Sequence, residues 1–380
     1  MTGREKIEAA FSPKGTPEIP AVICYEDIYH RDQWENLTKL PWWYRTSPVA
    51  EHQIARRRDL AEKLGKDWFI VPVAEPKEVR EAVSIEVKGD DVIQENKRTG
   101  EEKRLGKQRV GGWNESGGLQ SVEPEKMAET ESEVDARIPL PPPFDAKTFK
   151  TQERDVIARA LLKEFGKKLW PFNHVSAPLW NTYNLWGFDG MMTMVASNPD
   201  LVRYACDRYL QRNITAIREF AACGCAGVWI EECLMDMISV PMYVELAVPY
   251  LKATVKAIRE NGMKSIYYYC GDPNSRLEEI LSVGADAVGF EESKKGFVID
   301  IEDMAARVKG RCALLGNFDA MELLERGDRK AIRAEVKRQI AAGRKNGSRF
   351  ILSTGSPVTP GTPPDKVRLF TGLVHDLGGK

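Results

Sequence analysis

Reactive side chains recur directly after short apolar segments in the second half of the chain. They include the acids Glu232 and Glu291, the thiol of Cys270 and the imidazole of His174. Such groups are costly to remove from water, so they seldom gather in one place for structural reasons alone. Their types suit proton transfer and metal binding. The side chains that follow these segments are Asn173, His174, Glu231, Glu232, Cys233, Cys270, Asp272, Glu291, Glu292, Asn317, Asp319, Ser353 and Ser356.

The apolar segments that precede these side chains are typical of buried parallel strands. Helical segments separate them, the longest at residues 199–223 and 241–261. Because this alternation favours a parallel sheet and no glycine-rich phosphate-binding motif is present, we predict an α/β fold with a closed (β/α)₈ TIM barrel. The carboxyl ends of barrel strands meet at one mouth, where the reactive side chains would converge. Strands are predicted at residues 19–24, 68–73, 169–175, 227–230, 265–269, 287–291, 313–315 and 350–353.

Two segments depart from the regular alternation. Residues 25–44, in an elaborated loop after the first strand, are rich in aromatic side chains and contain Asp27 and His30. Residues 82–145 hold two alternating stretches around a turn, which predict an antiparallel β-hairpin, and then a proline-rich stretch. We therefore expect one barrel domain over residues 1–380, with an N-terminal extension and with residues 82–145 as an insertion.

Composition excludes several classes of function. The 380 residues contain 55 Lys and Arg against 56 Asp and Glu, and the net charge of -1 gives no reason to expect a nucleic acid or an anionic membrane as a partner. No apolar stretch is long enough to span a bilayer, and the charged start of the chain is unlike a signal peptide, so we expect a cytoplasmic protein. The seven cysteines lack disulfide-framework spacing and are expected to be free thiols or ligands.

The segment from about residue 170 to the end resembles the uroporphyrinogen-decarboxylase superfamily, which also contains zinc-dependent methyltransferases that work with corrinoid proteins. The superfamily has the predicted barrel fold. The first half of the chain matches more weakly. The motifs that carry the resemblance are Ala177-Pro178-Leu179, Gly187-Phe188-Asp189-Gly190, Asn198-Pro199-Asp200, Tyr269-Cys270-Gly271-Asp272, Gly284-Ala285-Asp286, Leu315-Gly316-Asn317-Phe318-Asp319, Ile351-Leu352-Ser353-Thr354-Gly355 and Thr359-Pro360-Gly361-Thr362-Pro363-Pro364.

The resemblance implies a zinc site in the methyltransferase branch, where the metal is bound by a His-x-Cys pair and a later cysteine. Cys270 matches the first cysteine, but Tyr268 occupies the histidine position and Ser356 stands where the later cysteine is expected. Zinc accepts thiolate and carboxylate ligands, and a catalytic site needs three of them. We predict Glu232, Cys270 and Glu291 as an alternative set. The competing interpretation is a buried thiol beside glutamates that pair with lysine or arginine.

The remaining candidates are predicted to act on the substrate. In one interpretation His174 is a proton donor or substrate contact, because an imidazole exchanges protons near neutral pH. In the other it is a structural histidine. Asp189 and Asn317 are candidate hydrogen-bonding residues of the catalytic rim. The expected substrate-binding residues are Asp27, His30, Trp34, Trp43 and Tyr268.

The leading hypothesis is a methyltransferase that demethylates a small methylated substrate, preferably a methoxylated aromatic. The methyl group would pass to the Co(I) of a separate corrinoid protein, with zinc as the Lewis acid on the ether oxygen. The alternative is a metal-free decarboxylase or lyase, in which Asp189 or His174 protonates a carbanion. A non-catalytic corrinoid carrier is disfavoured because the chain lacks the corrinoid-binding histidine signature. A homodimer is left open.

Overall fold

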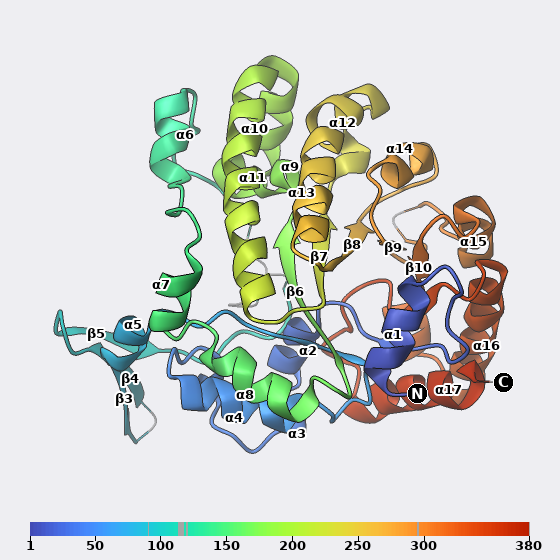
Figure 1. Cartoon of the computed structure of the whole chain (residues 1–380), viewed down its shortest axis with the longest axis horizontal. Coiled ribbons are helices and arrows are strands. Elements are labelled where there is room, and N and C mark those ends of the chain that lie inside the picture. Colours follow the sequence, from blue (N-terminus) through green and yellow to red (C-terminus); the bar gives the residue numbers. More distant parts are fainter. Residues whose placement is uncertain (90, 113–117, 119–120, 295, 380) are drawn as a thin grey trace.

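The computed structural model describes residues 1–89, 91–112, 118, 121–294 and 296–379. Eight strands form one parallel sheet in the order β1-β11-β10-β9-β8-β7-β6-β2, which confirms the predicted TIM barrel (Figure 1). Their bounds agree with the predicted strands to within a few residues. They are β1 Ala21–Val22, β2 Trp68–Ile70, β6 Trp170–Ser176, β7 Gly227–Glu232, β8 Lys264–Tyr269, β9 Ala287–Phe290, β10 Ala313–Leu315 and β11 Phe350–Ser353.

The seam between β1 and β2 is closed by one aspartate. The backbone N–H of Asp67 donates to the carbonyl of Ala21 at 2.8 Å, and the Asp67 carboxylate accepts the N–H of Ala21 at 2.7 Å. The same carboxylate lies 2.9 Å from Nε2 of His375 and 3.6 Å from Nζ of Lys6. Asp67 therefore replaces the missing strand pairing at this seam.

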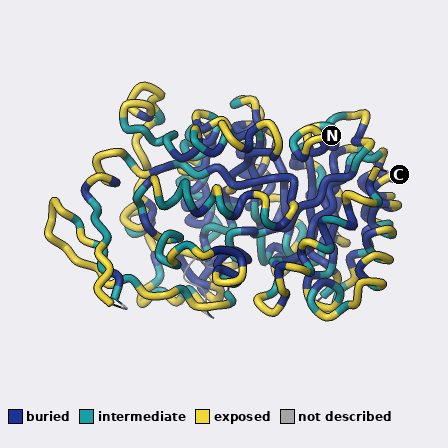
Figure 2. The backbone as a smooth tube through the Cα atoms, turned by 90° about the horizontal axis from the view of Figure 1, so that it is seen from below, coloured by how far each residue is buried: buried dark blue, intermediate teal, exposed yellow. Residues whose placement is uncertain are grey.

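Helices surround the barrel, and the strands are its most deeply buried part (Figures 1 and 2). The predicted helix at residues 241–261 is two helices, α12 and α13, because Pro249 cannot continue the hydrogen bonding of α12. The helices are α1 Gly3–Phe11, α2 Glu26–Asp32, α3 Trp34–Leu37, α4 Ala50–Leu60, α5 Lys77–Glu81, α6 Glu131–Arg137, α7 Ala146–Thr151, α8 Val156–Phe165, α9 Pro178–Asn181, α10 Tyr183–Ser197, α11 Pro199–Ala222, α12 Val240–Leu246, α13 Val248–Glu260, α14 Leu277–Ser282, α15 Ile301–Val308, α16 Arg329–Lys345 and α17 Pro364–Gly378. None of the described helices is long and apolar enough to cross a membrane.

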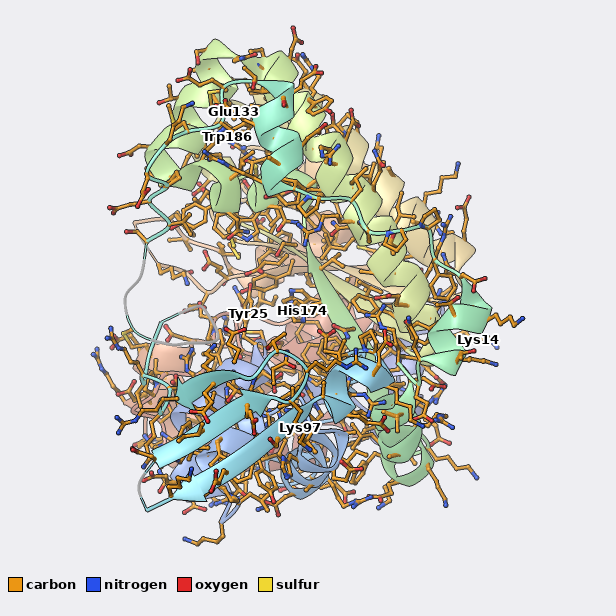
Figure 3. All side chains as sticks on the ribbon, turned by 90° about the vertical axis from the view of Figure 1, so that its left-hand side faces the viewer. Lys14, Tyr25, Lys97, Glu133, His174 and Trp186 are labelled. Carbon is orange, nitrogen blue, oxygen red and sulfur yellow. The ribbon has the colours of Figure 1, made fainter. Side chains whose placement is uncertain are left out.

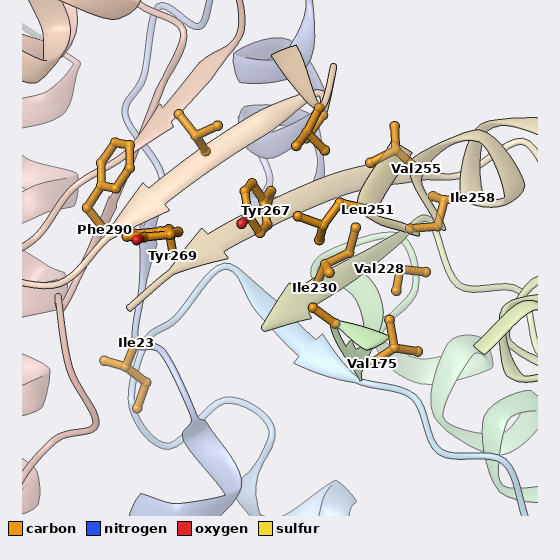
Figure 4. Packing of buried hydrophobic residues seen from close by; sticks show 14 of the residues in the cluster. Ile23, Val175, Val228, Ile230, Leu251, Val255, Ile258, Tyr267, Tyr269 and Phe290 are labelled. Atoms are coloured by element: carbon orange, nitrogen blue, oxygen red, sulfur yellow. The ribbon is translucent and has the colours of Figure 1, made fainter. Parts of the chain in front are cut away.

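Alternate side chains of each strand face opposite sides of the barrel wall, as a pleated strand requires. Outward residues pack under the helices; Figure 4 shows Val228, Ile230 and Tyr267 among them, beside Leu251 and Ile258 of α13. Inward residues form a separate cluster in the barrel interior, and α1 adds three side chains to it. Its members are Ile7, Ala10, Phe11, Val22, Cys24, Trp68, Ile70, Trp170, Phe172, Trp229, Ile266, Tyr268, Ala287, Ala313, Leu315 and Ile351.

The insertion contains the predicted hairpin and one strand more. Strands β3 Val83–Lys88, β4 Asp91–Asn96 and β5 Glu101–Leu105 pair antiparallel in that order, apart from the barrel sheet (Figure 1). The loop after β5 is tied to α2. Arg31 donates to the carbonyl of Gly112 at 2.9 Å, and the N–H of Gly111 donates to Asp32 at 2.9 Å. The insertion thus contacts the same helix that begins next to the barrel mouth.

Candidate active site at the carboxyl ends of the barrel strands

The pleat of β7 decides which of two adjacent acids reaches the barrel interior. Gly227 and Trp229 face inward, and a Cβ at Gly227 would lie 2.1 Å from the ring of Trp170, so no larger residue fits there. Glu231 has the same parity and lines a cavity in the mouth. Glu232 has the opposite parity and is fully buried behind the wall. The inward acid is therefore Glu231.

The cavity beside Glu231 has a volume of about 160 Å³, and four aromatic rings line it together with charged side chains. We call it the aromatic cavity. The rings of Tyr25 and Trp229 meet edge to face, with centroids 5.9 Å apart. His174 reaches the cavity from β6, and its side chain remains exposed; Figure 3 labels it next to Tyr25. The lining residues are Tyr25, Glu26, Asp27, Ile28, Arg45, Trp68, Ile70, Phe172, His174, Trp229 and Glu231.

Tyr25 connects the N-terminal segment to the strand ends. Its backbone adopts the left-handed conformation, with φ 51°, directly before α2. Its hydroxyl donates to Oε1 of Glu231 at 2.8 Å and lies 3.7 Å from Sγ of Cys270. Burial raises the pKa of Tyr25 well above its ordinary value, so the phenol stays protonated and remains a donor. Sγ of Cys233 lies 3.8 Å from the same oxygen of Glu231.

Asp27 lies on the cavity wall within a cluster of cations. Its carboxylate is 3.6 Å from Arg57 and 3.9 Å from Arg56, and its carbonyl accepts from Arg45 at 2.8 Å. Burial alone would raise the pKa of Asp27, but Arg57, a hydrogen bond from His30 and Arg56 together hold it well below its ordinary value. Asp27 is therefore an ionised, fixed acid of the cavity wall.

The other predicted substrate-binding residues do not line the aromatic cavity. His30 is buried behind it, with Nδ1 3.6 Å from Asp27. Trp34 is a core residue whose indole N–H donates to the carbonyl of Leu40 at 2.9 Å. Trp43 packs against Tyr44 and His52 instead. The physical reason is that the aromatic segment, residues 25–44, coils into short helices. Tyr29 and Trp34 are buried in the core, and the short helix Trp42–Arg45 packs against α4.

Tyr268 is buried in the barrel interior. Its ring stacks on Trp229 with centroids 4.6 Å apart, and its hydroxyl donates to the carbonyl of Gly355. It supports the floor of the mouth and is not part of the aromatic cavity wall.

The two other predicted catalytic residues lie away from the cavity. Asn317 is buried, and its amide donates to the carbonyls of Glu291 at 3.1 Å and Ile299 at 2.9 Å. It therefore orders the loop after β9. Asp189 is exposed on α10, two residues after the kink at Gly187, outside the aromatic cavity. Of the three predicted catalytic side chains, the structure brings only His174 to the cavity.

The three predicted metal ligands are not brought together. Cys270 faces the mouth beside Tyr25, but Glu232 points away from it, toward Tyr267 and the α12–α13 layer. Burial raises the pKa of Glu232 well above its ordinary value and so favours the protonated acid. Within the described residues, no three His, Cys, Asp or Glu side chains are placed to hold one metal ion. The zinc site implied by the family resemblance does not fit the side chains in this arrangement.

Glu291, the third predicted ligand, belongs to a different cluster at the mouth, which we call the Lys294 cluster. Nζ of Lys294 lies 2.5 Å from Oε1 of Glu291, 2.5 Å from Oγ of Ser356 and 3.9 Å from Oε1 of Glu292. Burial would lower the pKa of Lys294, but attraction to Glu292 and Glu291 raises it above its ordinary value. The competing interpretation from the sequence, glutamates paired with a lysine, therefore describes Glu291.

A larger, open cavity of about 840 Å³ shares His174 with the aromatic cavity. It lies between the end of β6, α11 and the proline-rich stretch of the insertion, and Arg137, Arg154 and Arg212 line it. Arg154 forms an ion pair with Glu219. The imidazole of His174 is thus accessible from two sides.

Reactive side chains at the carboxyl ends of parallel barrel strands are typical of α/β-barrel enzymes, whose active sites lie at that end of the barrel. A family model described as uroporphyrinogen decarboxylase (URO-D) matches residues 126–377, and the chain belongs to that family. It is 29% identical over 195 residues to a uroporphyrinogen decarboxylase of Anaeromyxobacter dehalogenans, covering 51% of this chain and 53% of the relative. A uroporphyrinogen decarboxylase of Pseudomonas putida is 26% identical over 268 residues, covering 67% and 71%.

A solved structure of a methyltransferase from Methanosarcina mazei has the same fold along the whole chain. The TM-score is 0.64 at 15% sequence identity, and the alignment covers 99% of both chains. At this identity the likeness concerns the fold. The chain spans about half the length of the first curated relatives that it matches.

Several residues of the site were missed by sequence reasoning. Glu231 could have been recognised by counting alternate positions from the inward Gly227, because the parity of β7 then selects it. Tyr25 and Arg45 belong to the aromatic segment, whose path the sequence pattern does not give. Lys294 follows β9 in a loop that shows no periodicity.

Proposed function

We propose that the protein is a methyltransferase that demethylates a small methoxylated aromatic compound and transfers the methyl group to the Co(I) of a separate corrinoid protein. The observation that carries the proposal is the aromatic cavity itself. An apolar cavity of about 150 Å³ accommodates benzene, so the 160 Å³ cavity is sized for one substituted ring and not for a tetrapyrrole. Tyr25, Trp229 and Phe172 supply faces and edges against which such a ring packs.

The polar groups of the cavity suit the breaking of an aryl methyl ether. The methyl group leaves with its bond to oxygen broken, Co(I) supplies the electron pair of the new bond, and the aryl oxygen keeps the old pair and takes a proton. His174 is the exposed imidazole on the wall and is proposed to give that proton. Tyr25 and Glu231, joined by their 2.8 Å hydrogen bond, would fix the part of the wall against which the substrate ring packs.

This proposal assigns no step to zinc. The resemblance implies the metal, but Glu232 faces away from the mouth and Glu291 is held by Lys294. A proton from His174 would make the phenol a sufficient leaving group, which is the role that a Lewis acid would otherwise have. The zinc content of the purified protein therefore becomes a direct test of the site, and we expect activity to survive exhaustive chelation.

The experiment uses free cob(I)alamin as the methyl acceptor and a panel of methoxylated benzenes as donors. Formation of methylcobalamin is followed by its absorption, and the phenol is followed by chromatography. His174→Ala should lower the rate by about 100-fold or more, as loss of a general acid does. His52→Ala is the matched control, because His52 lies outside the aromatic cavity. Equal rates for the two variants would exclude His174 as the acid.

The second candidate is decarboxylation of a carboxylated substrate, and the larger cavity favours it. That cavity has about 840 Å³, and its lining includes His174 and three arginines, of which Arg154 is paired with Glu219; such a lining would suit a polyanion. The curated relatives are named uroporphyrinogen decarboxylases. Release of CO₂ from uroporphyrinogen without any cobalt compound, lost in Arg212→Ala, would favour this function over methyl transfer.

A further inference from the structure

The loops after β9 and β11 bring three oxygen ligands around one cation. Lys294 lies between Glu291, Glu292 and Ser356, at 2.5, 3.9 and 2.5 Å from their side-chain oxygens. An ammonium group has three donors and no acceptor. Here it is within hydrogen-bond distance of Glu291 and Ser356, whereas Glu292, at 3.9 Å, interacts with it through charge alone. Carboxylate and hydroxyl oxygens are also ligands that divalent cations bind.

The acids of this cluster are fixed independently of the lysine. Glu291 accepts the backbone N–H of Gly271 at 3.0 Å. Glu292 is 8% exposed and packs against Gly355, where a Cβ would lie 2.6 Å from its Oε2. That oxygen has no well-formed hydrogen bond among the described residues. The cluster therefore contains a buried acceptor that the lysine does not satisfy.

We propose that the ammonium group of Lys294 is the resident cation of this cluster and takes the place that a divalent metal ion would occupy between Glu291, Glu292 and Ser356. One ammonium charge balances one of the two carboxylates, whereas a divalent ion would balance both. Removal of the lysine should therefore create a metal site. A metal could reach it, because Lys294, Glu292 and Ser356 line an open cavity of about 250 Å³.

The test is a titration of the full-length protein with Co²⁺ alone, measured by calorimetry and by visible absorption. Lys294→Met keeps most of the side-chain volume and removes the charge. We expect it to bind one Co²⁺ at least about 100-fold more tightly than the wild type, since it removes a positive charge within about 4 Å of the site. Lys264→Met is the control, because Lys264 pairs with Asp286 at the other end of β8. It should bind Co²⁺ as the wild type does.

Two results would overturn the proposal. One is a folded Lys294→Met variant without the gain in affinity. The other is tight binding of one Co²⁺ by the wild type that Glu292→Gln weakens, since the lysine would then not occupy the site. If Lys294→Met does not fold, the wild-type titration decides, and absence of such binding supports the proposal. No methyl donor enters the titration, so its outcome is separate from that of the methyl-transfer assay.

Discussion

The two sides of the barrel mouth differ in whether the side chains that face the open space are paired with cations. Around the aromatic cavity, Asp27 and Glu26 are paired with cations, whereas Glu231 accepts the hydroxyl of Tyr25 and faces the open space with His174. In the Lys294 cluster, Glu291 and Glu292 are closed on an internal ammonium group. A carboxylate that is already paired with an internal cation is less able to interact with a substrate. The comparison supports the proposal that substrate chemistry takes place on the side of β6 and β7, whereas the acids on the side of β9 and β11 are paired with Lys294.

The aromatic side also depends on a buried ion pair behind it, and breaking that pair should have the largest effect. Nζ of Lys66 lies 2.9 Å from Oε2 of Glu26, with both side chains almost fully buried. Lys66→Met would leave the Glu26 carboxylate uncompensated, and the free energy of unfolding should fall by about 3–5 kcal/mol. Urea denaturation measures this change.

The control for that variant is a lysine in a more exposed ion pair. Lys63 and Asp59 lie 2.7 Å apart, but both side chains are about one third exposed. Lys63→Met should cost at most about 1 kcal/mol. If the two variants were destabilised equally, the buried pair would not be what supports the aromatic side.

Glu231→Gln should reduce methyl transfer by about tenfold to 100-fold, with the fold retained. The change replaces the charged acceptor of the Tyr25 hydroxyl by a neutral one, and hydrogen bonds to charged groups are worth about 1.5–3 kcal/mol. Rates with a saturating methoxyaromatic donor and cob(I)alamin measure the effect. Unchanged rates would show that the aromatic cavity is not where the ether is broken.

Glu232→Gln should leave the rate of methyl transfer close to that of the wild type and change stability slightly. Burial raises the pKa of Glu232 in the folded state above its value in the unfolded chain. The folded protein therefore favours the protonated acid, and this contribution to stability is lost as pH rises through the unfolded pKa toward the folded one. The amide cannot ionise, so its advantage over the wild type should grow with pH.

Thermal unfolding of both proteins at pH 5 and pH 8 measures that difference. We expect the unfolding temperature of the variant, relative to that of the wild type, to be higher at pH 8 than at pH 5 by on the order of 1–3 °C. If the variant were more stable than the wild type only at pH 5, Glu232 would not be the protonated acid that we infer.

Much of the fold could be predicted because strand and helix periods are local properties of the sequence. The strands at residues 313–315 and 350–353 were predicted with the bounds that β10 and β11 have. The division of the predicted helix 241–261 into α12 and α13 could also have been predicted, because a proline such as Pro249 inside a helical pattern ends the helix.

The site was harder to predict, because a shift of one position along a strand exchanges the inner and outer faces. Ending the fourth predicted strand at residue 230 made Glu231 and Glu232 equivalent rim residues, whereas β7 extends through both. The prediction for residues 25–44, the aromatic segment, was wrong for another reason. Trp34 and Trp43 were predicted to bind a ligand from their type alone. Trp34 is instead buried in the core, and Trp43 packs on Tyr44 and His52.

The central claim is that the aromatic cavity demethylates a methoxylated ring. The most direct test is to incubate the wild-type protein with a donor carrying a ¹³C-labelled methoxy group and cob(I)alamin, and to follow the label by NMR. The account predicts that labelled methylcobalamin and the free phenol appear in equal amounts, also after chelation, and much more slowly with Glu231→Gln. Absence of label on cobalt across the donor panel, together with CO₂ release from uroporphyrinogen, would contradict it.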